Sequence, residues 1–159
     1  MSGSEPKGAI SGAGTTISVL ERLQAIEDIK ALKARYFRFM DTKQWDALIE
    51  VFTTDMQVIS PSGQVWMTGG PAFAASLKNS LEHSISVHQG FMAEIEIIDA
   101  DNAKGIWSMQ DVIEWKDRHP REGWKSIVGR GHYHDTYRRT DGIWRIATLS
   151  LTRLRLDTT

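Results

Sequence analysis

Hydrophobic positions near the start of the chain follow a helical spacing, whereas those further along alternate with polar ones. Apolar residues recur at every third position from Leu20 to Leu32, and the stripe continues through Tyr36 to Met40. Such a spacing places one apolar face along an amphipathic helix. We therefore predict a long helix over about residues 18–40.

The start of this helix carries a capping signal. Ser18 and Glu21 have the spacing of a capping box, in which each side chain satisfies a free backbone N–H of the first turn. Shorter patterns follow, and a turn at Pro61-Ser62-Gly63 divides two strand-like runs. These patterns predict short helices at about 45–52 and 71–81, and short strands at about 56–60 and 64–68.

The remainder of the chain reads as long strands joined by short turns. We expect strands at about 86–98, 103–115, 124–139 and 143–156. Short connections between successive strands predict an antiparallel meander. Helices followed by a long antiparallel sheet indicate an α+β fold, with three helices from the N-terminal half packed against a strongly curved, mostly antiparallel sheet. A curved sheet wrapped around helices leaves a conical cavity.

Composition narrows the possible functions. A chain of 159 residues fits one domain, which we expect over 17–159 after a Gly- and Ser-rich tail at 1–16. The absence of cysteine rules out disulfides and thiolate chemistry. A net charge of −1 makes nucleic acid an unsuitable partner, and no apolar run is long enough to cross a membrane. We expect a cytoplasmic protein.

One carboxylate falls on an apolar strand face. Alternation along 103–115 places Asp111 beside Trp107 and Ile113. Burying an unpaired charge costs several kcal/mol or more, so Asp111 needs a partner or must be neutral. Two interpretations stay open: a functional carboxylate in an apolar cavity, or a structural one bonded to an arginine or to the backbone.

The histidines differ in their surroundings. His119 lies in a charged loop and is expected to be solvated. His132 and His134 share one strand face and could ligate a metal, but no third ligand is evident and we predict no metal site. His88 lies in the first long strand, where strict alternation puts it on the face of Met92 and away from the apolar side. A bulge near Gly90 is needed to turn His88 inward.

The end of the long helix supplies further candidates. Tyr36 continues its apolar stripe and would present a hydroxyl to any cavity there. Asp41 follows at the helix end, where a cap of the next helix is the simpler explanation. The chain has no phosphate-binding loop, nucleophile elbow or HExxH helix. Histidine, aspartate and tyrosine suit proton transfer, so we expect no cofactor.

Two segments carry a family resemblance. ERLQAIEDIKALKARYFRFMDTKQWDALIEVFTTDMQV and GRGHYHDTYRRTDGIWRIATLSLTRLRLD resemble the SnoaL-like family of the nuclear-transport-factor-2-like superfamily, which has a cone-shaped α+β barrel. Within it, the pattern is similar to bile-acid 7α-dehydratase, scytalone dehydratase and hexachlorocyclohexane dehydrochlorinase. The resemblance implies one catalytic site, formed by Tyr36, Asp41, His88, Asp111 and Arg153. Arg145 and Arg155 are rivals for the position of Arg153.

The resemblance also implies an activity. We expect a cofactor-independent lyase that dehydrates, or otherwise eliminates from, a small hydrophobic substrate, steroid-like or aromatic. The alternatives are an isomerase or cyclase using the same proton-transfer pair, and a non-catalytic module that binds a ligand or another subunit. Relatives imply a homodimer or homotrimer. Candidate cavity walls are Trp66, Phe73, Phe91, Met92 and Trp107.

Overall fold

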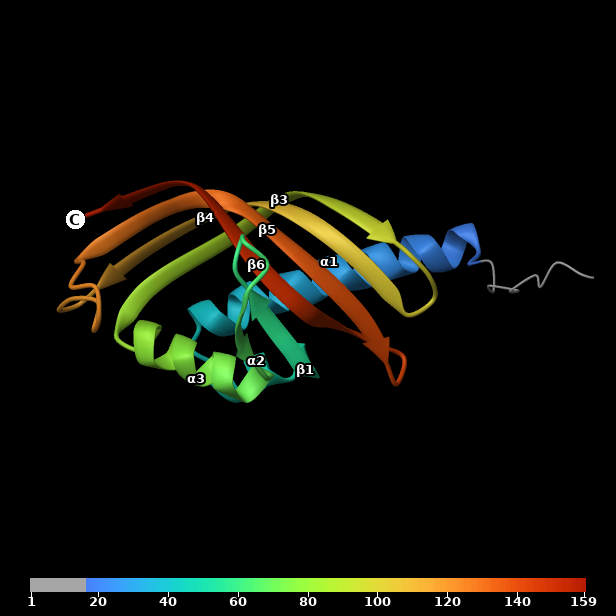
Figure 1. Cartoon of the computed structure of the whole chain (residues 1–159), viewed down its shortest axis with the longest axis horizontal. Helices are drawn as coiled ribbons and strands as arrows, with labels where there is room; N and C mark the ends of the chain where they lie inside the picture. Colours follow the sequence, from blue (N-terminus) through green and yellow to red (C-terminus); the bar gives the residue numbers. More distant parts are fainter. Residues whose placement is uncertain (1–16) are drawn as a thin grey trace, which may run out of the picture.

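A computed structural model describes residues 17–159, so the predicted tail at 1–16 lies outside the described residues. Its elements follow the order expected from the sequence (Figure 1). They are α1 (Val19–Asp41), α2 (Trp45–Ile49), β1 (Phe52–Ile59), β2 (Val65–Thr68), α3 (Gly70–Leu81), β3 (Ser84–Ile97), β4 (Asn102–Trp115), β5 (Ser126–Thr140) and β6 (Ile143–Thr158).

Helix α1 begins at the predicted capping box. Ser18 Oγ accepts from the backbone N–H of Glu21, and the Glu21 carboxylate accepts from the Ser18 backbone N–H at 2.9 Å. Its buried residues include Ile29, Leu32 and Tyr36, which belong to the stripe read from the sequence. The helix lies along the hollow of the arched sheet, as Figure 1 shows. Its last residue, Asp41, therefore ends inside the fold.

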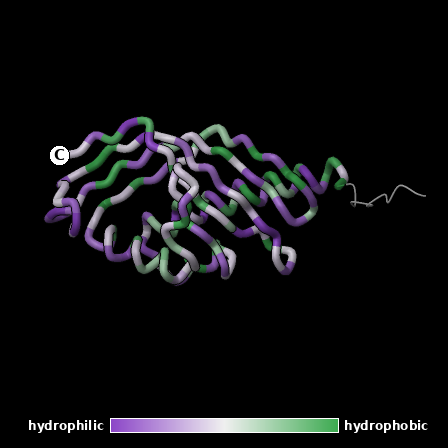
Figure 2. Tube along the Cα trace, viewed as in Figure 1, coloured by the Kyte–Doolittle hydropathy of each residue, from purple (hydrophilic) through white to green (hydrophobic). Residues whose placement is uncertain are grey.

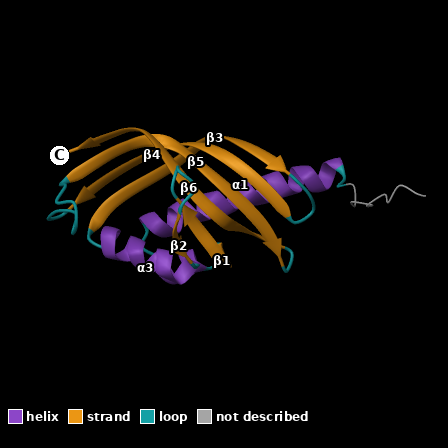
Figure 3. Ribbon diagram, viewed as in Figure 1, coloured by secondary structure: helices purple, strands orange, loops and turns teal. Residues whose placement is uncertain are grey.

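The sheet is mixed, with strand order β2-β1-β6-β5-β4-β3. The four long strands form the predicted antiparallel meander, and β1 joins β6 in parallel. The helices, coloured purple in Figure 3, lie on the concave side of the sheet. Along β4, every second residue from Ala103 to Trp115 is buried, as alternation predicted. Figure 2 shows hydrophobic and hydrophilic residues alternating along the long strands.

A bulge interrupts β3 after its first half. The pairing of β3 with β4 shifts register between Phe91 and Glu94, and Met92 has φ +43°. The bulge changes which face points inward: Ser86 and His88 are buried before it, and Ile97 is buried after it. The inward turn of His88 that required a bulge is thus confirmed.

No helix among residues 17–159 is long and apolar enough to cross a membrane. The core lies between α1 and the concave face, and its fully buried aliphatic residues include Ile29, Met40, Leu48, Met56 and Ile146. A cone-shaped α+β fold is confirmed by this arrangement.

Candidate active site

A cavity of about 390 Å³ opens between α3, the β1–β2 hairpin and the concave face of the sheet. That volume falls within the range of small-molecule sites. Most of its wall is apolar and includes Met40, Val58, Trp66, Phe73, Leu77 and Leu151. The polar groups on its wall come from six residues: Tyr36, Ser80, His88, Asp111, Tyr133 and Arg153. Four of the five residues predicted for the site therefore line one cavity.

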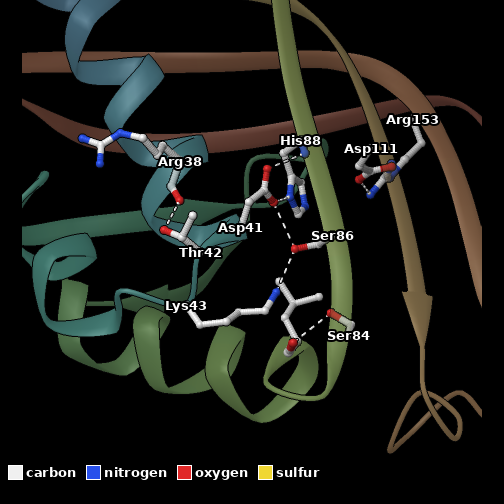
Figure 4. A network of polar contacts seen from close by, with 10 residues as sticks. Arg38, Asp41, Thr42, Lys43, Ser84, Ser86, His88, Asp111 and Arg153 are labelled. Atoms are coloured by element: carbon white, nitrogen blue, oxygen red, sulfur yellow. Dashed lines mark hydrogen bonds and ion pairs between the residues drawn. The ribbon is translucent and has the colours of Figure 1, made fainter.

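The fifth predicted residue, Asp41, does not line the cavity but forms hydrogen bonds to His88 (Figure 4). Asp41 Oδ1 lies 2.6 Å from Nδ1 of His88, and Asp41 Oδ2 accepts from the His88 backbone N–H at 2.8 Å. A carboxylate only accepts, so Nδ1 carries the hydrogen and the lone pair of the neutral ring is on Nε2. The predicted contact between the two side chains is confirmed. Asp41 is not a cap of α2, because no side chain caps that helix.

Ser86 is the third hydrogen-bond donor to the Asp41 carboxylate. Ser86 Oγ donates to Asp41 Oδ1 at 3.0 Å and accepts from Lys43 Nζ at 2.8 Å. Figure 4 shows this chain running from Lys43 through Ser86 to Asp41. Partial burial lowers the pKa of Lys43, although the charge of Asp41 opposes the shift. Three hydrogen bonds thus fix the carboxylate, and through it the plane of the His88 ring.

Asp111 forms a bidentate ion pair with Arg153. Arg153 Nη1 and Nη2 donate to the two carboxylate oxygens at 2.7 and 2.6 Å. The side chain of Asp111 is 3% exposed and that of Arg153 is 32% exposed, so Arg153 is the more accessible member of the pair. Burial opposes the charge on Arg153, but the hydrogen bonds and charge of Asp111 prevail and raise its pKa. The structural interpretation of Asp111 is confirmed, because it is paired with an arginine. Asp111 also lines the cavity, and its functional interpretation stays a prediction.

Two buried tyrosines stand beside this pair. The rings of Tyr36 and Tyr133 meet edge to face, with centroids 6.2 Å apart. Burial is the main reason that the pKa of each phenol is raised, so both remain protonated donors at neutral pH. Tyr133 was not among the expected site residues. Its position opposite His132 and His134 in the strand alternation was the available signal.

Behind the tyrosines lies a buried ion pair that the sequence did not indicate. Lys33 Nζ is 2.6 Å from Asp135 Oδ2, and both side chains are fully buried. The ammonium also lies 3.8 Å from the centre of the Tyr133 ring. Burial lowers the pKa of Lys33, although Asp135 opposes the shift. Tyr137 donates to the same carboxylate oxygen at 3.0 Å.

Several expected wall residues lie elsewhere. Trp66 and Phe73 line the cavity. Phe91 and Trp107 instead line a cleft of about 400 Å³ between α1 and β3, on the other side of Asp41 and His88. Met92 is 85% exposed on the bulge and belongs to neither space. The bulge accounts for Met92, because it places His88 and Met92 on different faces, whereas a regular strand would keep them on one face.

The rival arginines and the other histidines are also placed. Arg145 donates to Thr140 at 2.7 Å, and Arg155 pairs with Asp157 at 2.8 Å, so neither competes with Arg153. His132 and His134 lie on the convex face, and the described residues contain no group of three metal-ligating side chains. The expectation that His119 is solvated is wrong. It is 8% exposed and packs edge-on against Trp115, with ring centroids 4.9 Å apart.

Comparison with known proteins agrees with this architecture. Residues 21–150 match the model of the SnoaL-like domain. A probable cyclase, FGR4 of Gibberella zeae, is 26% identical over 141 residues, which cover 82% of this chain and 92% of the cyclase.

Solved structures share the fold. A scytalone dehydratase candidate from Novosphingobium aromaticivorans superposes with a TM-score of 0.76 at 16% identity, covering 89% of this chain and 92% of that one. Hexachlorocyclohexane dehydrochlorinase LinA-type3 from Novosphingobium barchaimii gives a TM-score of 0.72 at 21% identity, covering 89% and 94%. The domain match spans most of the chain, and the chain therefore belongs to the SnoaL-like family, with the cone-shaped fold of the nuclear-transport-factor-2-like superfamily.

Proposed function

We propose that this chain is a lyase that eliminates a leaving group from a small hydrophobic substrate, with His88 as the general base. The observation that carries the proposal is the Asp41–His88 pair at the wall of an apolar cavity. Nε2 of His88 makes no hydrogen bond within residues 17–159, so its lone pair is available to a ligand. The activities of the family relatives support an enzyme-like role.

The reaction would proceed by proton abstraction. Nε2 takes a proton from carbon, the C–H electron pair forms a carbon–carbon double bond, and the leaving group departs from the adjacent carbon. When that group is a hydroxyl, the imidazolium returns the proton and water is released. Tyr36, Tyr133 and Arg153 stabilise the negative charge that develops on oxygen. Imidazole, phenol and guanidinium supply every proton and charge that these steps need, so the proposal includes no cofactor.

A cyclase or isomerase is the second candidate. The observation that favours it is the similarity to the probable cyclase over 82% of this chain. Both reactions start with the same proton transfer to His88, and they differ in what the electron pair of the broken C–H bond does next. A product of unchanged mass would identify isomerisation or cyclisation, whereas loss of water or hydrogen chloride would identify elimination.

The test is an elimination assay on purified protein with hydroxylated steroids, hydroxylated aromatics and chlorinated alicyclic compounds, read by mass spectrometry. On the substrate that turns over, His88→Ala is expected to lower kcat about 100- to 10,000-fold, the usual contribution of a general base. Asp41→Asn should lose most activity, because an amide no longer selects the tautomer with a free Nε2.

The matched control is His83→Ala, since His83 is exposed and lies outside the cavity. Circular dichroism must show that each variant is folded. Full activity of His88→Ala would reject His88 as the general base, whereas a wild type that turns over none of these compounds would leave the chain as a binding module.

A further inference from the structure

A second polar side chain, that of Ser80, lines the end of the cavity away from His88, where the loop between β4 and β5 folds onto α3. Nε1 of Trp115 donates to the backbone carbonyl of Ser80 at 2.7 Å. Ser80 Oγ lies 2.7 Å from Nε2 of His119, whose ring packs on Trp115. Ser80 lines the cavity and His119 does not, so the histidine supports the serine from outside.

The hydrogen bonds of His119 fix its tautomer. The backbone N–H groups of Arg121 and Glu122 both donate to Nδ1, at 3.2 and 2.9 Å. An atom that accepts from two N–H donors carries no hydrogen itself, so the hydrogen of the neutral ring is on Nε2. Burial, followed by the charge of Arg121, lowers the pKa of His119, although Glu122 opposes the shift, and the neutral form is favoured.

This tautomer decides what Ser80 can do. Because Nε2 donates, Ser80 Oγ is the acceptor of that bond and keeps its own hydrogen to donate. Ser84 provides a contrast, since its hydroxyl donates to the Leu81 carbonyl at 2.8 Å. Ser80 Oγ donates no hydrogen bond within residues 17–159. The same geometry excludes a serine nucleophile, because a histidine that donates to the hydroxyl is not its base.

We infer that Ser80 is a specificity residue that donates a hydrogen bond to a carbonyl or carboxylate oxygen at the far end of the ligand. In the pairing of β3 with β4, His88 faces Asp111 and Ser84 faces Trp115. The two pairs are four residues apart, about 13 Å of extended strand. The ligand is therefore elongated and apolar, with its reacting carbon at His88 and an acceptor oxygen near Ser80.

This inference deepens the proposed function, because it concerns the same cavity, but it does not depend on proton transfer by His88. It predicts binding selectivity that survives in a protein without catalytic activity. Ligand binding and turnover therefore test the two proposals separately.

The tautomer is tested first, by long-range proton–nitrogen correlation NMR on protein labelled with ¹⁵N-histidine. His119→Phe assigns the signals of His119 by their loss. The expected result is a protonated Nε2 and an unprotonated Nδ1 at neutral pH. A protonated Nδ1 would overturn the inference, because the Ser80 hydroxyl would then donate its hydrogen bond to Nε2 of His119 and not to a ligand.

Selectivity is tested with two probes of the same shape, 4-acetylbiphenyl and 4-ethylbiphenyl, of which only the first has an acceptor oxygen. Dissociation constants are measured by calorimetry for the wild type and Ser80→Ala. One neutral hydrogen bond changes affinity about three- to tenfold, so the preference for the ketone should fall by that factor in Ser80→Ala. Ser76→Ala, one turn earlier on α3 and outside the cavity wall, should keep the wild-type preference.

Three results would contradict this inference. An unchanged preference in Ser80→Ala, or a preference lost only in His88→Ala, would mean that the ketone binds elsewhere. Failure of both probes to bind the wild type would mean that the cavity does not accept an elongated apolar ligand. Loss of elimination activity in His88→Ala, with selectivity retained, would support both proposals.

Discussion

Asp41 uses both carboxylate oxygens to hold one histidine, through the ring at 2.6 Å and through the backbone N–H at 2.8 Å. With only the contact between Asp41 Oδ1 and His88 Nδ1, the imidazole ring would be free to rotate about the line that joins these two atoms. The backbone contact ties the carboxylate to β3 itself, so that ring and strand keep one geometry. Such preorganisation matters because a displacement of about 1 Å at a reacting group can cost about 100-fold in rate.

Gly129 provides a prediction at the Asp111–Arg153 pair. A Cβ there would come within 1.8 Å of Arg153 Nη1 and 2.1 Å of Asp111 Oδ1. Gly129→Ala is therefore expected to displace the guanidinium and lower kcat at least tenfold, while the flexible arginine absorbs most of the strain. The measurement is kcat together with the melting temperature.

Gly131→Ala is the contrasting variant. Its Cβ would lie 1.9 Å from the Thr152 carbonyl oxygen, which is backbone. We expect a loss of about 1–3 kcal/mol of unfolding free energy, measured by denaturant unfolding, because β5 and β6 must separate. A Gly129→Ala protein with unchanged kcat would show that the position of the pair is irrelevant to turnover.

Residue types and alternation supplied candidates for this site, and the family resemblance joined them into one set. Tyr36 and Asp111 followed from apolar faces, and the family resemblance chose Arg153 over its rivals. Residue patterns alone left Asp41 ambiguous, because a helix end suits a cap as well as a buried carboxylate. His119 was misjudged because its charged neighbours suggested solvent, whereas the loop folds back onto Trp115. That contact is tertiary, and local sequence does not contain it.

Helix α1 and strand β5 are joined by the Lys33–Asp135 pair. Neither charge has access to solvent, and Asp135 Oδ1 has no partner within residues 17–159. Lys33→Met leaves a buried carboxylate without its cation and should cost about 3–5 kcal/mol of unfolding free energy. Lys33→Met combined with Asp135→Asn should recover most of that loss, because the amide oxygen still accepts from Tyr137. Denaturant unfolding of both proteins measures the difference, and equal stabilities would argue against a buried charge.

The loop between β4 and β5 should make stability depend on pH through His119. Its folded-state pKa is lowered by burial, so the unfolded chain takes up a proton at a higher pH than the folded one. Unfolding free energy is therefore expected to decrease as pH falls below about 6.5, the ordinary pKa of histidine, and to level off below the folded-state pKa. His119→Phe keeps the contact with Trp115 and should remove this part of the slope. An identical slope in His119→Phe would assign it to other groups.

Element order was predictable from periodicity, since the long helix and the four long strands were placed within a few residues of their ends. The parallel pairing of β1 with β6 was not predicted. Sequence periodicity describes each strand alone, and it contains no information on which distant strand becomes its neighbour. The bulge in β3 could be inferred only because His88 was on the wrong face without it.

The convex side of the whole molecule exposes apolar side chains on neighbouring strands. Val87 pairs with Val112, and they are 48% and 41% exposed, while Ile85 is 76% exposed. We expect self-association through this face, because exposed apolar patches commonly mark interfaces. Light scattering should give a mass above the 17.9 kDa of one chain, and Val112→Arg should reduce it to the mass of the monomer. Asn79→Arg on α3 is the matched control, and a monomeric wild type would contradict the expectation.

Strand β6 lies between β1 and β5, although it is the last strand of the chain. During synthesis, the β1–β2 hairpin and the β3–β5 meander emerge from the ribosome before the strand that joins them. Until β6 follows, β1 and β5 each present an unpaired edge, the kind of surface that invites aggregation and recruits chaperones. A premature stop codon just before Ile143 would therefore yield a chain without a closed fold, although every residue proposed to act at the cavity except Arg153 would already have been made.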